Sequence, residues 1–239
     1  MIIPTLQGVI ERRMLINFAA DPAVIQNILP KPFRPQLAGD KAIAGICLIR
    51  LKSVRLKGLP AFVGLSSENS AHRIAVEWDS KEGIQRGVYI PRRDTSSWLN
   101  AFAGNWFFPG DHYRAAFDVK EANGQYKIAL NSADGICIRI DASICAYMEK
   151  NSVFRDLESA SLFFKNGSIG YSPKQNGFEG IQLKTHSWQV QPLKVTEVYS
   201  SYFQNERIFP KGSIAFDNAL LMTNIEHEWA PVESKMQCL

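Results

Sequence analysis

The chain has 239 residues, of which 46% are hydrophobic and 11% aromatic, so it is long and apolar enough to bury a full core. Its net charge of +4 comes from scattered Lys and Arg residues with no basic run, which argues against a nucleic-acid partner. No apolar run reaches the roughly 18 residues of a membrane span, which argues against a membrane partner. The N-terminal residues do not resemble a signal peptide, and together these features indicate a cytoplasmic protein.

The cysteines indicate buried thiols in a reducing compartment rather than disulfides. Cys47, Cys137 and Cys145 lie inside apolar runs, and no two of the four cysteines form a C-x-x-C pair. Neither cysteines nor histidines cluster at the spacing of zinc ligands. We therefore expect neither a metal nor a cofactor.

The N-terminal third alternates strands with one short helix. Residues 11–18 predict a first strand, and Asp21 followed by Pro22 predicts the start of a helix. Residues 41–52 are apolar on both alternating faces, which is typical of a strand covered on both sides. Residues 68–78 predict the next strand.

The strand 68–78 carries candidate catalytic groups on one of its faces. Successive side chains of a strand point to opposite faces, so Glu68 and His72 share a face that becomes apolar toward its C-terminal end. If this face points into a barrel, these two residues line the open end. Alternatively, Glu68 lies in the preceding loop. On the other face we expect Arg73 and Glu77 to form a surface ion pair.

The stretch from 87 to 115 combines basic and aromatic residues. Residues 87–90 predict a strand, and Arg92, Arg93 and Asp94 follow Pro91. Thr95 is a suitable N-cap for a helix over 96–103. An aromatic turn then precedes a Pro-Gly-Asp-His sequence.

The remaining sequence predicts further strands and one helix. We expect a hairpin at Asn123-Gly124, a strand over 136–147, a helix capped by Asp156 that ends at Lys165, a loop over 167–180, a long strand region over 181–202 bent at Pro192, a short helix over 216–221 and a closing strand over 224–232. Without repeats or linkers, residues 1–239 are expected to form a single domain.

Three sequence pieces together resemble a known family. They are the Asp-Pro helix that ends in LPKPF (29–33), the strand ENSAHRIAVE (68–77) and the aromatic turn FFPG (107–110). In this order they resemble the acetoacetate-decarboxylase-like superfamily, and within it a bacterial branch described only as a domain of unknown function. The likeness extends over residues 11–229. It implies a mainly β, α+β fold: a cone-shaped, antiparallel closed barrel with a few flanking helices and a ligand cavity inside.

The resemblance also argues against the superfamily's decarboxylation chemistry. True decarboxylases place a Schiff-base lysine and a second lysine just after an aromatic-Pro pair. Here Phe108-Pro109 matches that pair, but Gly110 and Asp111 follow it, so no imine can form there. The family's cavity glutamate matches Glu68. Its first-strand arginine falls near residue 11, so that Arg12 or Arg13 substitutes only with a shifted register.

These considerations give a set of candidate site residues. An acid/base role in catalysis is assigned to Glu68, His72 and His112. A ligand-binding role is assigned to Arg92, Arg93, Asp111, Trp106 and Phe108. Each also has a structural alternative: a strand-end glutamate, a hydrogen-bonded histidine in the barrel wall, a solvated arginine turn or a packed aromatic core.

Three functions fit this reading. The chain is a cofactor-free enzyme for an organic acid or carbonyl compound, a non-catalytic binding protein for a hydrophobic or anionic small molecule, or a scaffold whose cavity is filled by its own side chains. The sequence does not separate them. Relatives of the superfamily assemble as oligomers, so a homo-oligomer is compatible with the resemblance.

Overall fold

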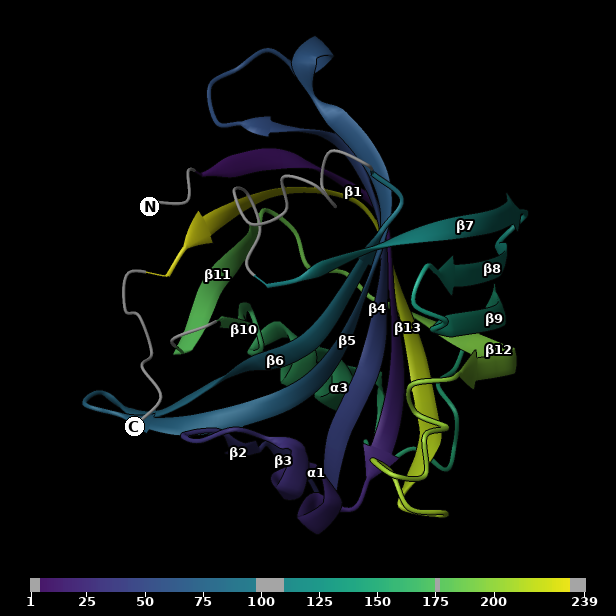
Figure 1. Cartoon of the computed structure of the whole chain (residues 1–239). Coiled ribbons are helices and arrows are strands. Elements are labelled where there is room, and N and C mark those ends of the chain that lie inside the picture. Colours follow the sequence, from purple (N-terminus) through teal and green to yellow (C-terminus); the bar gives the residue numbers. More distant parts are fainter. Residues whose placement is uncertain (1–4, 98–109, 175–176, 233–239) are drawn as a thin grey trace.

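A computed structural model describes residues 5–97, 110–174 and 177–232, which form one sheet of 13 strands (Figure 1). The helices are α1 (Pro22–Ile28), the short 3-10 helix η1 (Ala61–Val63) and α3 (Leu157–Lys165). The strands in chain order are β1 (Leu6–Ala20), β2 (Arg34–Pro35), β3 (Leu37–Ala38), β4 (Lys41–Leu56), β5 (Leu65–Ser80), β6 (Gly83–Thr95), β7 (His112–Ala122), β8 (Gln125–Ser132), β9 (Cys137–Ile144), β10 (Ile169–Lys174), β11 (Gly177–Thr185), β12 (Gln191–Ser200) and β13 (Ile214–Pro231).

The sheet closes into two rings that share five strands. The larger ring has nine strands, in the order β6-β7-β8-β9-β12-β13-β1-β4-β5, and closes where β5 pairs with β6. The smaller ring has seven strands, because β10 and β11 also connect β6 to β13. We call the common strands β13, β1, β4, β5 and β6 the shared wall. In Figure 1, β7, β8, β9 and β12 lie on one side of the long strands, whereas β10 and β11 lie on the other.

The rings diverge where two strands of the shared wall change partners along their length. Strand β6 pairs with β10 through Val88 and Tyr89, and then with β7 from Arg93 onward. Strand β13 pairs first with β12 and then with β11. The closed rings of strands confirm the expected mainly β fold. The sheet is antiparallel except at β6, to which both β10 and β7 run parallel.

Local sequence signals correctly predicted both caps and the hairpin. The Asp21 side chain accepts a hydrogen bond at the start of α1, and Asp156 with Ser159 forms a capping box on α3. Asn123 and Gly124 have φ angles of 51° and 75°, as the tight turn between β7 and β8 requires.

Three local predictions were wrong, each because pairing within the sheet outweighed local preference. The segment 216–221 is part of β13 rather than a helix. The Gly- and Ser-rich segment 167–180 forms β10 and the start of β11, where ladder hydrogen bonds order it. The solvated turn, which was the structural alternative for Arg92 and Arg93, is instead a continuation of β6. Most of the expected helix 96–103 lies outside the described residues.

The two faces of the shared wall support different interiors. One face carries apolar side chains such as Met14 and Ile46 into the main core, where they pack with residues of β8 and β9. The opposite face, with Leu15 and Cys47, packs against Phe164 of α3. Adjacent residues of one strand therefore belong to different environments.

Gly45 allows two wall strands to approach closely. A Cβ atom at this position would lie 2.6 Å from the backbone oxygen of Ile16, which cannot move without shifting β1. We expect Gly45→Ala to lower the free energy of unfolding by about 2 kcal/mol. Denaturant unfolding measures this loss. Gly167→Ala is the matched control, since its Cβ would meet neighbours only at 3.5 Å and beyond, and equal stabilities of the two variants would contradict the expectation.

None of the helices in the described part of the chain is long and apolar enough to cross a membrane.

Candidate functional site

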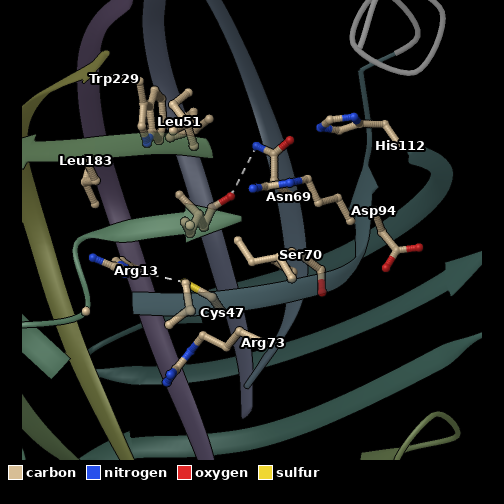
Figure 2. Close-up of a pocket in the computed structure, with 18 of the residues that line it drawn as sticks. Arg13, Cys47, Leu51, Asn69, Ser70, Arg73, Asp94, His112, Leu183 and Trp229 are labelled. Atoms are coloured by element: carbon tan, nitrogen blue, oxygen red, sulfur yellow. Dashed lines mark hydrogen bonds between the residues drawn. The ribbon is translucent and has the colours of Figure 1, made fainter. Parts of the chain in front are cut away.

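A cavity of about 120 Å³ lies on the α3 face of the shared wall, within the seven-strand ring (Figure 2). Every strand of that ring contributes to its lining. Its polar side chains include Arg13, Cys47, Asn69, Arg73, Arg93 and His112, and its apolar side chains include Ile49, Leu51, Ile90, Ile181, Leu183 and Trp229. The cavity is therefore an apolar chamber with a concentrated group of basic residues.

Arg13 and Cys47 contact each other at one side of this cavity. The Arg13 Nε atom donates a hydrogen bond to the Cys47 sulfur at 3.4 Å (Figure 2). The Arg13 guanidinium also lies 5.7 Å from the centre of the Trp188 ring. Its Nη1 atom is buried without a hydrogen-bond partner among the described residues. The Nε atom of Arg13 is thus fixed by Cys47, while its Nη1 atom can still donate a hydrogen bond to a ligand.

Arg73 is buried and is not the surface residue that the sequence suggested. It is 4% exposed, its Nη2 atom donates to Asn17, and its guanidinium lies 4.9 Å from the centre of the Phe164 ring. Gly45 lies opposite Arg73 across the β4–β5 pair and leaves room for it. Burial, assisted by the charge of Arg13, lowers the pKa of Arg73 to about 10.

Arg93 reaches the cavity from β6. Its Nε atom donates to the Ser172 hydroxyl of β10 at 3.3 Å, while its Nη2 atom is buried without a partner among the described residues. Burial lowers the pKa of Arg93 to about 10, so the guanidinium remains charged at neutral pH. The predicted ligand-binding residue Arg93 therefore does line the cavity.

No described carboxylate neutralises this group of arginines. Among the described residues, none of the ion pairs within 4.0 Å involves Arg13, Arg73 or Arg93. Asp94 borders the cavity, but its carboxylate accepts hydrogen bonds from Arg92 and points away in Figure 2. One buried and two half-buried positive charges thus share one small cavity, which is costly unless an anion joins them.

His112 borders the cavity at the start of β7. Its Nδ1 atom lies 3.0 Å from the carbonyl oxygen of Gly110, and because a carbonyl only accepts, Nδ1 carries the proton. Burial and the nearby charge of Arg93 lower the pKa of His112 to about 4. His112 is therefore a neutral imidazole at pH 7 and a weak proton acceptor.

Glu68 and His72, predicted to join His112, lie on the other face of the shared wall. The Glu68 carboxylate accepts hydrogen bonds from Arg12 and Arg50, which also bind Glu121 of β7. His72 is fully buried, with its Nε2 atom 3.2 Å from the hydroxyl of Ser200. The alternation of β5 is as predicted, but its cavity face is the one that carries Asn69, Ala71 and Arg73.

The other predicted ligand-binding residues are spread over several environments. Arg92 is 8% exposed and binds Asp94 and Asp134, so it belongs to the nine-strand ring. Asp111 is exposed to solvent. Trp106 and Phe108 lie outside the described residues. Arg92 therefore forms structural ion pairs with carboxylates, whereas its neighbour Arg93 lines the cavity.

Arg13, Arg73 and Cys47 were not among the candidate residues, although the sequence carries a signal for Arg73. On its strand face Arg73 lies between two alanines. A single basic residue among small residues on a buried strand face indicates a binding site for an anion. Arg13 required the register of β1, which the sequence left one residue uncertain. In the described part of the chain, no group of three His, Cys, Asp or Glu side chains could hold a metal ion.

Solved structures share this architecture. The acetoacetate decarboxylase of Legionella pneumophila matches with a TM-score of 0.61 at 13% identity, covering 98% of this chain and 88% of its own. An acetoacetate decarboxylase-like enzyme of Sphingomonas wittichii RW1 matches with a TM-score of 0.63 at 11% identity, covering 99% and 94%. The enduracididine biosynthesis enzyme MppR complexed with pyruvate matches with a TM-score of 0.54 at 7% identity, covering 100% and 92%. The chain therefore has an acetoacetate-decarboxylase-like fold.

The family within this fold follows from the sequence. Residues 9–220 match the family DUF2071, which is described as an uncharacterized conserved protein, and the chain belongs to this family. No curated protein matches the sequence. The expected branch without an assigned function is thus confirmed.

Proposed function

We propose that this protein binds a small organic anion, a carboxylate, in the cavity of the seven-strand ring. The observation that carries the proposal is the convergence of Arg13, Arg73 and Arg93 on one buried cavity without a carboxylate partner in the described residues. A carboxylate would accept hydrogen bonds from the unpaired guanidinium atoms and offset their charge.

The size of the cavity limits the ligand to a short acid. Its volume of about 120 Å³ is close to that of cavities that hold about six non-hydrogen atoms. The apolar lining from β4, β6, β11 and β13 suits a short carbon chain beside the carboxylate. A short-chain acid, with or without a carbonyl group, fits both properties.

The structural neighbours support the same ligand class without defining a reaction. One is named for acetoacetate, and another is complexed with pyruvate, so related cavities accept oxo acids. An imine route is not part of the proposal, because no lysine is among the lining residues described and the sequence has none between Lys81 and Lys120. A non-catalytic binding protein for an anionic ligand remains the alternative to an enzyme.

Binding of simple acids tests the proposal. Propionate and pyruvate are expected to raise the melting temperature and to give measurable heats of binding, whereas propionamide, which lacks the negative charge, is not. Arg93→Gln is expected to raise the Kd for propionate about tenfold to hundredfold, because it removes a charge-assisted hydrogen bond. Isothermal titration calorimetry measures both effects.

The matched control is Arg34→Gln. Arg34 lies on the surface and pairs with Glu77 and Asp79, so its replacement should leave the Kd unchanged. Equal binding of propionate and propionamide, or an unchanged Kd in Arg93→Gln, would contradict a carboxylate site.

A further inference from the structure

We propose that Cys47 is a nucleophile that adds to the carbonyl carbon of a short 2-oxo acid held by the three arginines. This inference rests on the proposed anion site and extends it by naming a reacting group. The sequence had predicted only that Cys47 is a buried thiol.

The surroundings of Cys47 suit a reactive sulfur. Its side chain borders the cavity from β4 and accepts the hydrogen bond from Arg13 Nε at 3.4 Å. The side chains of Arg73 and Arg93 border the same cavity as this sulfur. The thiolate is the nucleophilic form of a cysteine, and the Arg13 guanidinium is placed to donate a hydrogen bond to it.

A second observation points to a ligand beside this sulfur. The side chain of Arg73 is 4% exposed and borders the same cavity, and its Nε atom has no hydrogen-bond partner among the described residues. The Nη1 atom of Arg13 is in the same condition. These guanidiniums hold unused donors next to the thiol, where a bound anion would place its reactive carbon.

Other nucleophiles in the described lining are weaker. The lining there includes Ser70 and Ser168 but no lysine, and a serine hydroxyl needs a strong neighbouring base to act as a nucleophile. His112 does not supply one, since its pKa is lowered to about 4 by burial and Arg93. Cys47 is therefore the strongest nucleophile on the described wall of the cavity.

The addition balances without another reactant. The sulfur electron pair forms an S–C bond to the carbonyl carbon, and the C=O π electrons move to the oxygen. That oxygen takes the proton given up by the thiol, so the product is a thiohemiketal whose neutral hydroxyl lies beside the carboxylate. The guanidiniums of Arg13 and Arg93 hold the carboxylate and stabilise the oxygen while it is negatively charged.

Alkylation with a charged and a neutral reagent tests this role. Iodoacetate and iodoacetamide both react by the same step, in which the sulfur attacks the CH₂ carbon and iodide leaves with its electron pair. Only iodoacetate carries the carboxylate that the arginines would attract. Peptide mapping by mass spectrometry follows each cysteine in the same full-length protein, with Cys137 and Cys145 as references outside the cavity lining.

The expected result is a preference for the anion at Cys47 alone. The ratio of iodoacetate to iodoacetamide rates should be at least about tenfold higher at Cys47 than at Cys137, and labelling should saturate with iodoacetate concentration. Arg13→Gln should remove most of this preference, whereas Arg34→Gln should not. In the unaltered protein, propionate should slow labelling at Cys47 without affecting Cys137.

Two results would overturn the proposal. One is an equal rate ratio at the three cysteines, and the other is a Cys47 that neither reagent labels until the protein is denatured. Calorimetry with propionate separates these failures from a failure of the anion site: propionate that binds but leaves an unreactive Cys47 refutes only the nucleophile. If iodoacetate labels Cys47 preferentially but propionate does not bind, the nucleophile is supported and the proposal of a short carboxylate ligand is refuted.

Discussion

Lowering the pH from 7.5 to 4.5 is expected to reduce the free energy of unfolding by about 5 kcal/mol through His72 and His227 alone. Both imidazoles are buried, at 0% and 2% exposure. Burial, with the charge of Arg92, lowers the pKa of His72 to about 3, and burial lowers that of His227 to about 4. The folded state therefore keeps them neutral in a range where the unfolded chain takes up protons.

The sign of this effect follows from proton uptake. Each histidine contributes stability that is complete above the unfolded pKa of about 6.5 and is lost as the pH falls toward the folded value. The loss approaches about 1.4 kcal/mol per pH unit for each group. Denaturant unfolding at several pH values measures how the free energy of unfolding changes with pH. A free energy of unfolding that stays constant from pH 6.5 to 5 and falls only where carboxylates take up protons would contradict the expectation.

Substitutions assign the slope to particular residues. His72→Asn is expected to lower stability at neutral pH, because it disturbs the core, but also to flatten the decline between pH 6.5 and 4.5. His186 is exposed, so His186→Asn is the matched control and should preserve the full slope. A decline of the same steepness in His72→Asn would show that this imidazole is protonated equally in both states.

Replacing Arg92 is expected to be far more damaging than replacing its neighbour Arg93. Arg92→Met should lower the free energy of unfolding by about 3 to 5 kcal/mol, because it leaves the carboxylate of Asp94, which is 1% exposed, without its cation. Burial already raises the pKa of Asp94, and the bond from Arg92 opposes that rise. Without Arg92, Asp94 must be buried as an unpaired charge or take up a proton.

Arg93→Met tests the opposite situation on the next residue. Arg93 has no carboxylate partner among the described residues, so its loss removes a positive charge that the ligand-free fold does not compensate. We expect its ligand-free stability to be unchanged or higher, together with loss of propionate binding. Comparable destabilisation of both variants in urea unfolding would mean that Arg93 also has a structural role.

Local signals allowed much of the fold to be predicted. The capping residues Asp21 and Asp156 and the Asn123-Gly124 turn act through their immediate neighbours, so the sequence alone is sufficient to locate them. The segments 167–180 and 216–221 depend on pairing with distant strands, which local composition does not encode. The prediction therefore failed where β10 and β13 join the ring.

The candidate site was harder to predict, because its position depends on which strand face is enclosed. The period of β5 was correct, yet Glu68 and His72 were assigned to the cavity instead of Arg73. Both faces of this strand are buried, so alternation of polar and apolar residues does not distinguish them. His112 and Arg93 were proposed because they flank the aromatic turn and the helix expected before it, and both border the cavity.

The wall common to both rings has a consequence for how such a protein can diversify. Side chains at neighbouring positions such as 12 and 13, or 92 and 93, point to opposite faces of the shared wall, so single substitutions can alter a bound molecule while the contacts on the reverse face stay intact. A one-residue insertion or deletion within these strands would instead move the side chains that follow it to the opposite face of the shared wall. Natural variation in this part of the chain should accordingly consist of replacements rather than changes in length.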